Sequence, residues 1–457
     1  MTKKLLYISL LALLLGAASC RKYVEVTQPN QRTFKYTSDF QALLNDVNVM
    51  ETSASLPMLS SDDINIGTNT SMQNLLTNGY DNIYTWAATY YTSDQSDAGW
   101  DQLYNLVYVC NQITANVMTS TEGTDQQKKQ VYAEAQVQRA ATYLTLVNLY
   151  ARVYNEANAA SDPGLPLLLS PDLFVNLTRS SVKAVYDQII KDLTDAIPNL
   201  PDVGANRLHP GKGGAYAVLA RTYLYMQRYT DAADNAAKSL TYQHTLLNLD
   251  DYVTGGKAFP RRLDNVEVMM SKKAMKPGFI DLPLSTDLVK LFDTRDLRYV
   301  LFTRNGTSFF PAFDGRGSYR DRMFGGDNNT VTVGVGVPEM MLIQAEGLAR
   351  SGDKDGALAL INTLRQNRFK AADYAPLTAA TADAVLHLVL EERRRELFGT
   401  GLRWFDQRRL SVEPALAVTV TRTFKGNTYT LTSGDRYVYP IPPRNIDLNP
   451  ELIQNAR

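Results

Sequence analysis

The sequence predicts a mostly α-helical protein in which helices pack in pairs and carry long irregular segments. Apolar residues recur at three- and four-residue steps over several long stretches, which is the period of an amphipathic helix. Two helical hairpins share the same internal spacing of alanines. The stretches between the helices are rich in Gly, Asn, Asp and aromatic residues and hold only short apolar runs, so few and short strands are expected.

Residues 1–19 are predicted to be an export signal. Two lysines precede an apolar stretch from Leu5 to Leu15, and small residues then lead to Cys20. The stretch is shorter than the roughly 18 apolar residues of a membrane-spanning helix. Small residues before a cysteine are typical of a bacterial lipobox, which predicts cleavage before Cys20 and acylation of its thiol with a fatty acid such as palmitate. The alternative is an ordinary signal that is cut nearby, with Cys20 an incidental thiol.

The first long helices are predicted within residues 100–197. Trp100 begins a helix that runs to Cys110, and both side chains are expected in the core, with Cys110 an inert buried thiol. The next helix covers residues 126–152, and another covers 181–197 and is stopped by Pro198. One apolar face on the 126–152 helix is formed by Val137, Ala140, Leu144 and Val147.

Two helical hairpins are predicted over residues 214–240 and 338–367, the second turning at Gly352. Small alanines let two helices approach closely, which is the packing of a tetratricopeptide pair. The alanines that share one spacing are Ala220 and Ala232 in the first hairpin and Ala345 and Ala357 in the second. The two hairpins stand far apart in the sequence, so unrelated hairpins in an α-helical domain are the alternative interpretation.

The irregular segments, about residues 51–99 and 242–335, are too long to be simple connectors. Long irregular segments in a compact protein are usually binding surfaces or lids. We therefore expect the ligand-facing side of the molecule to be built from these two segments.

The composition argues against several classes of protein. The 47 basic and 47 acidic residues give a formal net charge of zero, which argues against a nucleic-acid binder. Two cysteines and three scattered histidines predict neither a metal site nor a cofactor. Phosphate-loop, zinc-protease and serine-hydrolase motifs are absent from the sequence.

Two pairs of adjacent acids, Asp62-Asp63 and Asp250-Asp251, could be offered as the carboxylates of a glycosidase. Adjacent acids point in different directions, and capping and solvation explain them more simply. No catalytic residue is predicted, and the protein is not expected to be an enzyme. A hydrolase is the alternative that oligosaccharide turnover would reveal.

The densest run of charge is Glu391–Glu396, followed by an Arg-Trp-Phe segment that ends at Arg409. Glu391 and Glu392 are both placed to pair with Arg395 on one helix, which Gly399 or Gly401 ends. The run is therefore predicted to be an ion-paired helix packed under the end of the fold.

The run Glu391–Arg409 resembles the C-terminal motif of the SusD/RagB family of nutrient-binding outer-membrane lipoproteins (starch-binding-protein-like). Three further stretches resemble segments of that family and occur in the family's order: Glu134–Ala140, Glu339–Glu346 and Tyr439–Pro450. The resemblance extends from about residue 20 to the C-terminus. One departure is Gly347, where an alanine is commoner in the family.

The resemblance implies a single domain over residues 20–457, with about four tetratricopeptide-like pairs mainly in 100–241 and 336–410. A loop-rich side would come from about 51–99 and 242–335, and a closing segment from 411–457. It also implies a lipid-anchored, cell-surface protein of the Gram-negative outer membrane. Such a protein captures oligosaccharides and delivers them to a TonB-dependent, SusC-like transporter. An envelope scaffold for protein interactions, or a binder of peptide or glycoprotein fragments, is the alternative.

Aromatic rings fringed by polar groups suit the apolar faces and hydroxyl edges of sugars. Trp86 is the first candidate, because an indole in a polar stretch has no obvious core to fill, whereas Trp100 and Trp404 are expected to be structural. The full candidate set is Tyr84, Trp86, Tyr90 and Tyr91 in one segment and Phe309, Phe310, Phe313 and Tyr319 in the other. For each ring, ordinary packing is the alternative to ligand contact.

Overall fold

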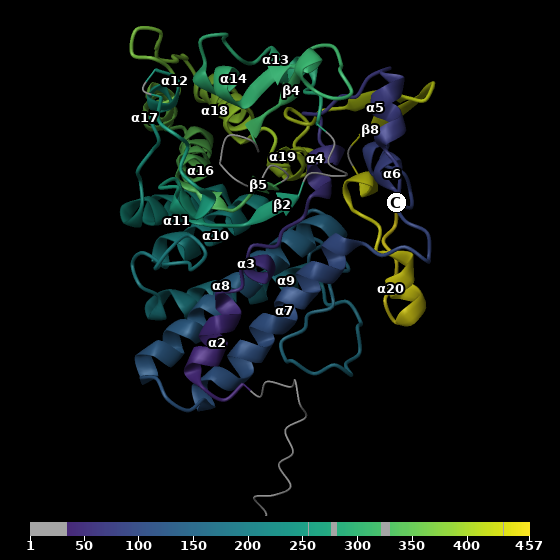
Figure 1. Ribbon diagram of the computed structural model, residues 1–457, viewed down its shortest axis with the longest axis vertical. Coiled ribbons are helices and arrows are strands. Elements are labelled where there is room, and N and C mark those ends of the chain that lie inside the picture. Colours follow the sequence, from purple (N-terminus) through teal and green to yellow (C-terminus); the bar gives the residue numbers. More distant parts are fainter. Residues whose placement is uncertain (1–33, 255, 276–280, 321–329, 433) are drawn as a thin grey trace, which may run out of the picture.

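The computed structural model describes residues 34–254, 256–275, 281–320, 330–432 and 434–457. The predicted signal at 1–19 and the predicted lipidation site Cys20 lie outside the described residues. Helices dominate, and the strands form two-stranded antiparallel ladders (Figure 1). The prediction of a mostly helical fold with few short strands is confirmed.

Eight helices of the described chain pack in succession, each against the next, and this number corresponds to the four pairs expected. Each of the helices predicted within residues 126–367 is confirmed, with ends that differ by a few residues. The eight are α7 (Ala98–Asn116), α8 (Asp125–Tyr150), α9 (Val182–Ala196), α10 (Lys212–Tyr225), α11 (Tyr229–Tyr242), α16 (Val337–Arg350), α17 (Lys354–Gln366) and α18 (Ala382–Leu397).

The two predicted hairpins, α10–α11 and α16–α17, are neighbours in space although residues 243–336 separate them in the sequence. Helix α16 packs directly on α11, so the stack continues across the gap. At the crossing, a Cβ on Gly347 would stand 2.5 Å from the Cβ of Ala233 and 2.7 Å from the carbonyl oxygen of Tyr229. Only a glycine allows so close an approach at this point.

Helix α8 lies between α7 and α9 and is buried on nearly all sides from Val131 onward. The expected single apolar face is therefore only part of its packing, because polar residues on its other sides are also buried. Arg139 forms a two-pronged ion pair with Asp192 of α9, at 2.7 and 2.8 Å, and donates a further hydrogen bond to Asn111 of α7. These contacts provide hydrogen-bond partners for the polar side chains that are buried between the helices.

The residues before α7 and those after α18 lie beside the stack of eight helices (Figure 1). The N-terminal part holds α2 (Thr37–Leu44), α3 (Val47–Met50), α4 (Leu56–Ser60), α5 (Thr70–Leu75) and α6 (Tyr80–Tyr84). Segment 51–99 thus contains short helical turns where the sequence predicted loop. After α18 come α19 (Leu402–Leu410), the hairpin β7 (Val420–Phe424) and β8 (Asn427–Leu431), and α20 (Pro443–Leu448).

In its described residues, the insert between α11 and α16 carries the remaining strands and three short α-helices. Its strands pair as β1 (Val268–Met270) with β6 (Val335–Gly336), β2 (Lys273–Met275) with β5 (Thr330–Thr332), and β3 (Thr303–Asn305) with β4 (Arg316–Ser318). Its helices are α12 (Asp250–Val253), α13 (Thr286–Val289) and α14 (Leu297–Phe302). Pairing β1 with β6 brings the two ends of the insert together beside the stack.

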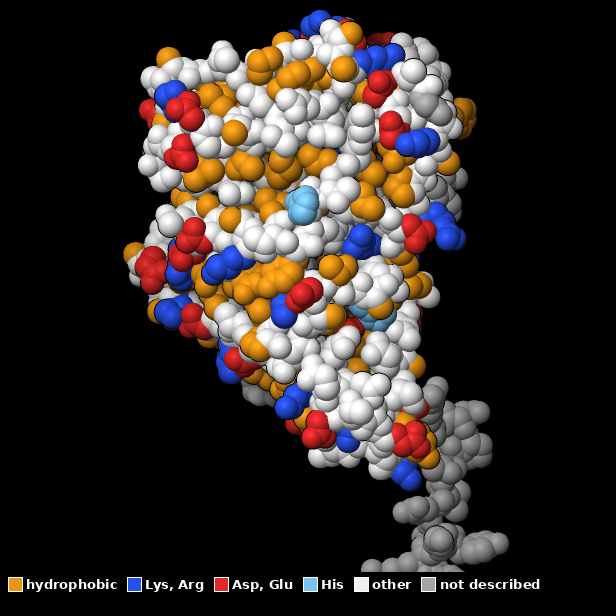
Figure 2. Space-filling model, turned by 90° about the vertical axis from the view of Figure 1, so that its left-hand side faces the viewer, with side chains coloured by type: hydrophobic (Ala, Val, Ile, Leu, Met, Phe, Trp, Pro, Cys, Tyr) orange, Lys and Arg blue, Asp and Glu red, His pale blue; other side chains and the backbone are white. Residues whose placement is uncertain are grey.

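Acidic and basic side chains are interspersed over the flank shown in Figure 2, with apolar side chains between them. This distribution agrees with the net charge of zero. Among the helices of the described residues, none combines the length and the hydropathy needed to cross a bilayer.

Candidate ligand-binding cleft

The two irregular segments meet in an open cleft of about 1150 Å³ at the end of the molecule where α5, α13 and β4 lie (Figure 1). One wall is the loop 65–69, and the other is the start of β4 with the residues before it. The lining residues are Asn65, Ile66, Gly67, Thr68, Asn69, Pro283, Leu284, Thr286, Val289, Lys290, Phe313, Asp314, Gly315 and Arg316. Both irregular segments thus line one cleft, and that this is the ligand-facing side stays a prediction.

The first wall, loop 65–69, is held on its buried side by the hydroxyl of a tyrosine. Tyr84 is fully buried, and its hydroxyl accepts a hydrogen bond from the backbone N–H of Ile66 at 2.9 Å. The same hydroxyl donates to Oδ1 of Asn65 at 3.4 Å. Gln73 of α5 donates to the carbonyl oxygen of Gly67 at 2.6 Å, which fixes the turn of the loop.

The second wall is the loop that joins β3 to β4. The rings of Phe309 and Phe313 stack with centroids 5.3 Å apart. They lie on Gly317, where a Cβ would stand 2.4 Å from the Phe309 ring, so this position has no room for a side chain. Asn69 donates from Nδ2 to the carbonyl oxygen of Ala312 at 3.1 Å and so links the two walls.

The cleft offers both kinds of surface that a sugar needs. Pro283, Leu284 and Phe313 form an apolar base, while Asn65, Thr68, Thr286, Lys290 and Asp314 are exposed around it. The ring of Phe310, in the same loop as Phe313, is 94% exposed. An apolar base with a few polar groups at its edge is the usual arrangement of a small-molecule site.

Arg422 of β7 holds the chain that leads into the first wall. Its guanidinium is buried and donates hydrogen bonds to the carbonyl oxygens of Leu59, Tyr84, Ser60, Ser61 and Ile64. The group lies 4.1 Å from the ring centroid of Tyr84 and 4.4 Å from that of Trp86. Stacking on aromatic faces and multiple donors are what distinguish arginine from lysine in such a place.

The charged run at 391–409 also acts on the first wall. Arg403 of α19 forms a two-pronged ion pair with Asp62 at 2.7 and 2.8 Å, and Arg394 of α18 bonds to Asp63 at 2.8 Å. The backbone carbonyl of Asp63 in turn accepts from the N–H of Ser285, which precedes α13. These contacts place residues 62–64 between the helices α18 and α19 on one side and the insert on the other.

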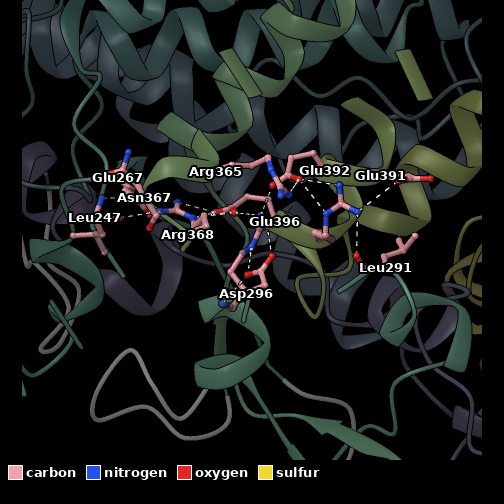
Figure 3. Close-up of polar contacts among 12 residues, drawn as sticks. Leu247, Glu267, Leu291, Asp296, Arg365, Asn367, Arg368, Glu391, Glu392 and Glu396 are labelled. Atoms are coloured by element: carbon pink, nitrogen blue, oxygen red, sulfur yellow. Dashed lines mark hydrogen bonds and ion pairs between the residues drawn. The ribbon is translucent and has the colours of Figure 1, made fainter. Parts of the chain in front are cut away.

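The second wall is tied to the same run through a buried ion network, drawn in Figure 3. Arg298 of α14 contacts Asp296, Glu392 and Glu396, each at 2.7 Å. Arg368 adds ion pairs to Glu396 and to Glu267 at 2.9 and 2.8 Å. Because α14 runs directly into β3, the network fixes the hairpin that carries the second wall.

Burial and charge act in opposite directions on these carboxyl groups. Burial alone would raise the pKa of Glu392, but Arg298, Arg395 and Arg365 hold that pKa at about 2. Likewise, the pKa of Asp62 is below its ordinary value, because the arginines around it, Arg403 first, outweigh the effect of burial. Burial raises the pKa of the neighbouring Asp63, since its arginine contacts compensate less.

Two family profiles match the chain. Residues 22–224 match the profile described as starch-binding associating with outer membrane, and residues 337–457 match the profile of the SusD family.

The chain belongs to the SusD/RagB family.

Among curated SusD/RagB relatives, SusD-like protein P38 of Formosa agariphila is 30% identical over 127 residues, which are 26% of this chain and 23% of that protein. SusD-like protein P2 of the same organism is 32% identical over 140 residues, 30% of this chain and 26% of that protein. The matched part thus spans about a quarter of each of these relatives.

Solved SusD structures share the fold over nearly the whole chain. A SusD superfamily protein from Bacteroides thetaiotaomicron superposes with a TM-score of 0.73 at 19% identity, covering 92% of this chain and all of that one. A sugar-binding protein, so named provisionally, from Bacteroides vulgatus gives 0.70 at 20% identity, covering 93% and 99%. A laminarin-binding SusD-like protein gives 0.66 at 19% identity, covering 92% and 99%.

The SusD/RagB fold places the candidate rings of segment 51–99 mainly in the interior. The reason given for Trp86, that it has no core to fill, is wrong: the indole is 3% exposed, and its Nε1 donates to the carbonyl oxygen of Ser60 at 2.9 Å. Tyr84 supports the first wall from below. Tyr90 is buried against Tyr439, and Tyr91 is half-buried beside Gly79. The three buried rings, Tyr84, Trp86 and Tyr90, therefore present no open face to a sugar, while a role for Tyr91 stays a prediction.

Of the candidate rings of the second segment, one lines the cleft. Phe313 lines it, Phe309 stacks behind Phe313, and Phe310 is exposed in the same loop. Tyr319 is half-buried, with its ring under the guanidinium of Arg304 at 4.6 Å. The sequence did not single out the polar residues of loop 65–69, although their Asn-Ile-Gly-Thr-Asn composition marks a turn-rich binding loop.

Other predicted structural roles are confirmed. Trp100, Trp404 and Cys110 are buried, and burial raises the pKa of the Cys110 thiol to about 12, so the thiol stays protonated and inert. Arg395 bonds to both Glu391 and Glu392 along α18, at 3.6 and 2.9 Å. Most contacts of this run, however, reach other elements, which the sequence did not indicate.

The acids offered for a glycosidase have separate partners. Asp62 and Asp63 are bound by arginines as described, while Asp250 accepts from Thr254 and Asp251 pairs with Lys257 on the surface. A second pocket of about 810 Å³ beside β1 and β6 is lined by Glu267, Glu339 and Glu396. Each of these three carboxylates is already paired with an arginine.

Proposed function

We propose that this protein is a lipid-anchored, surface-facing nutrient-binding protein of the outer membrane. It captures oligosaccharides in the cleft between loop 65–69 and the β3–β4 loop and delivers them to a TonB-dependent, SusC-like transporter. It binds its ligand without catalysing a reaction. The observation that carries the proposal is the cleft itself, with its apolar base and polar edge, on a SusD/RagB scaffold; the exposed Phe310 belongs to the loop that forms one wall.

The kind of ligand is supported by the chemistry of the cleft and by the relatives. A ring of Phe310 or Phe313 can lie against the C–H face of a sugar, while Asn65, Thr68 and Asp314 are placed for its hydroxyls. A structural neighbour binds laminarin, and one matching family profile is described as starch-binding. We therefore propose glucan oligosaccharides as the first ligands to examine.

The binding proposal is tested by isothermal titration calorimetry with a panel of α- and β-glucan oligosaccharides and Phe310→Ala. We expect the variant to lose about fivefold in affinity, because an exposed stacking ring contributes about 1 kcal/mol. Val412→Ala is the control, since Val412 is exposed but outside the cleft. Binding of peptides but of no oligosaccharide would support the peptide-binding alternative instead.

The lipid anchor is tested by metabolic labelling with an alkyne-bearing fatty acid in the native bacterium. The chain has two cysteines, Cys20 and Cys110, so each serves as the control for the other. We expect Cys20→Ser to abolish labelling and Cys110→Ser to leave it unchanged. Labelling that survives in Cys20→Ser would contradict an anchor at this residue.

A further inference from the structure

Large apolar side chains are concentrated on a second surface, away from the cleft. Among the described residues, five such side chains are at least 70% exposed: Leu173, Phe174, Phe310, Leu448 and Ile453. Phe310 belongs to the cleft loop. The other four lie on only two segments, the loop between α8 and α9 and the C-terminal stretch from α20 onward. Exposed apolar groups gathered in this way mark an interaction surface more often than scattered ones do.

Hydrogen bonds join the two segments to each other. The backbone N–H of Leu177 donates to Oε1 of Glu451 at 3.0 Å. Arg179 donates from its guanidinium to the carbonyl oxygen of Ile453 at 2.9 Å. We call the four exposed side chains, Leu173, Phe174, Leu448 and Ile453, the paired-tip surface.

The loop that carries Leu173 and Phe174 is fixed at both flanks. Asn111 of α7 donates from Nδ2 to the carbonyl oxygens of Leu168 and Ser170, at 3.0 and 3.1 Å. On the other flank, Arg179 donates to the carbonyl oxygens of Gly164 and Pro163, both at 2.8 Å. A firmly held support lets exposed rings dock as a rigid body, with little entropy lost on binding.

The charge around the paired-tip surface indicates what covers it. Asp172 lies beside Leu173, and Asp447 and Glu451 lie beside Leu448 and Ile453. Residues 169–177 and 443–453 contain these three acids against one arginine, Arg444, and no lysine. An anionic lipid surface attracts segments rich in lysine and arginine, so an acidic border disfavours it. The same border complements a protein surface with basic residues around an apolar centre.

We propose that the paired-tip surface docks this protein onto a protein partner that offers an apolar patch bordered by lysine and arginine. The inference rests on the proposed function, in which that partner is the outer-membrane transporter. The cleft and the docking surface are then separate: one takes the ligand, and the other holds the protein to its transporter.

The test uses the full-length protein in its native membrane, extracted with mild detergent and immunoprecipitated, with transporter recovery as the readout. We expect Leu173→Ser/Phe174→Ser and Leu448→Ser/Ile453→Ser each to reduce transporter recovery at least tenfold. Oligosaccharide affinity and melting temperature should stay at wild-type values. Phe310→Ser is the matched control: an equally exposed ring is removed, so ligand affinity falls while transporter recovery is retained.

Each other outcome has a defined meaning. If wild type recovers the transporter and both paired-tip variants recover it equally well, the docking inference is overturned while the proposed function stands. If wild type recovers no transporter, the delivery step and the docking inference both fail.

Two further measurements address other occupants of the surface. If the unlipidated Cys20→Ser protein floats with anionic vesicles and Phe174→Ser abolishes this flotation, the surface binds lipid and the proposal is overturned. If the protein is a dimer that the paired-tip substitutions dissociate, the surface binds a second copy and the proposal is likewise overturned. Conversely, Asp172→Lys/Asp447→Lys should weaken transporter recovery if basic residues border the partner's patch.

Discussion

Arg422 shows how one buried side chain can organise a recognition loop. It donates to carbonyl oxygens of residues 59–64, and the rings of Tyr84 and Trp86 lie close to its guanidinium. Buried backbone carbonyls need donors, and here one guanidinium satisfies several that no regular ladder reaches. The tryptophan is therefore part of the support of the cleft rather than its surface.

The first prediction concerns Trp86→Ala. We expect the free energy of unfolding to fall by about 3–5 kcal/mol, because a buried indole leaves a cavity and the Ser60 carbonyl loses its donor. Urea denaturation measures the change, and Phe310→Ala should stay within about 0.5 kcal/mol of wild type. If Trp86→Ala has unchanged stability but no longer binds ligand, the indole contacts the ligand and the structural role is wrong.

At the residue scale the sequence distinguished side-chain types better than their surroundings. It placed Trp100, Trp404 and Cys110 in the core because each sits in an apolar or helical pattern. It predicted that Trp86 is exposed, because the neighbouring residues are polar. The partner that buries Trp86 is Arg422, which comes from a hairpin near the other end of the chain. Contacts between such distant segments leave no trace in a local pattern.

At the scale of elements, the stacked helices were predictable because their period and their alanines are local signals. The packing of α11 on α16 was not, since residues 243–336 lie between them. Gly347, noted only as a departure from the family, marks that crossing. The two- and three-residue strands of the insert were expected only in general terms, because they are too short to show alternation.

The second prediction concerns Gly347→Ala in α16. An alanine gains about 1 kcal/mol in helix propensity over glycine, but its Cβ would overlap Ala233 and the Tyr229 carbonyl. We expect a net loss of about 1–3 kcal/mol in the free energy of unfolding, measured by chemical denaturation. Gln344→Ala, a half-buried position on the same helix, should change it by less than about 0.5 kcal/mol. A stabilised Gly347→Ala would show that α11 and α16 do not approach this closely.

At the scale of the whole molecule, the signature run Glu391–Arg409 connects the scaffold to both walls of the cleft. Arg394 and Arg403 hold residues 62–63, and Glu392 and Glu396 hold α14 before β3. The sequence indicated that this run is structural and ion-paired. It could not indicate which distant segments it joins, and these contacts are what relate the family's most recognisable stretch to the cleft.

The third prediction concerns acid. Glu392 has a pKa of about 2 in the folded protein against 4.5 ordinarily, so its stabilising contribution is complete above about pH 4.5. It is lost as the pH falls from 4.5 to 2, by up to about 3 kcal/mol. Denaturation between pH 7 and 2 should show wild type losing this stability. Glu392→Gln should be weaker at neutral pH, because it leaves buried arginines unpaired, and should lose less on acidification.

The matched control for the acid experiment is Glu391→Gln. The carboxylate of Glu391, next to Glu392 in the sequence, is half exposed and forms a longer contact with Arg395, at 3.6 Å. Glu391→Gln should therefore follow the wild-type curve. Identical acid profiles for wild type and Glu392→Gln would contradict the assigned role of the buried network.

The continuity of the helix stack across the insert has a consequence for how such proteins diversify. Loop-closure free energy rises only slowly with length, so doubling an insert costs about 0.6 kcal/mol. Between Tyr242 and Val337 the chain can thus vary in length while α11 and α16 still meet, provided that Glu267 and Arg298 keep their buried ion pairs. Changes confined to the loop between β3 and β4 would therefore alter one wall of the cleft and leave the helical framework as it is.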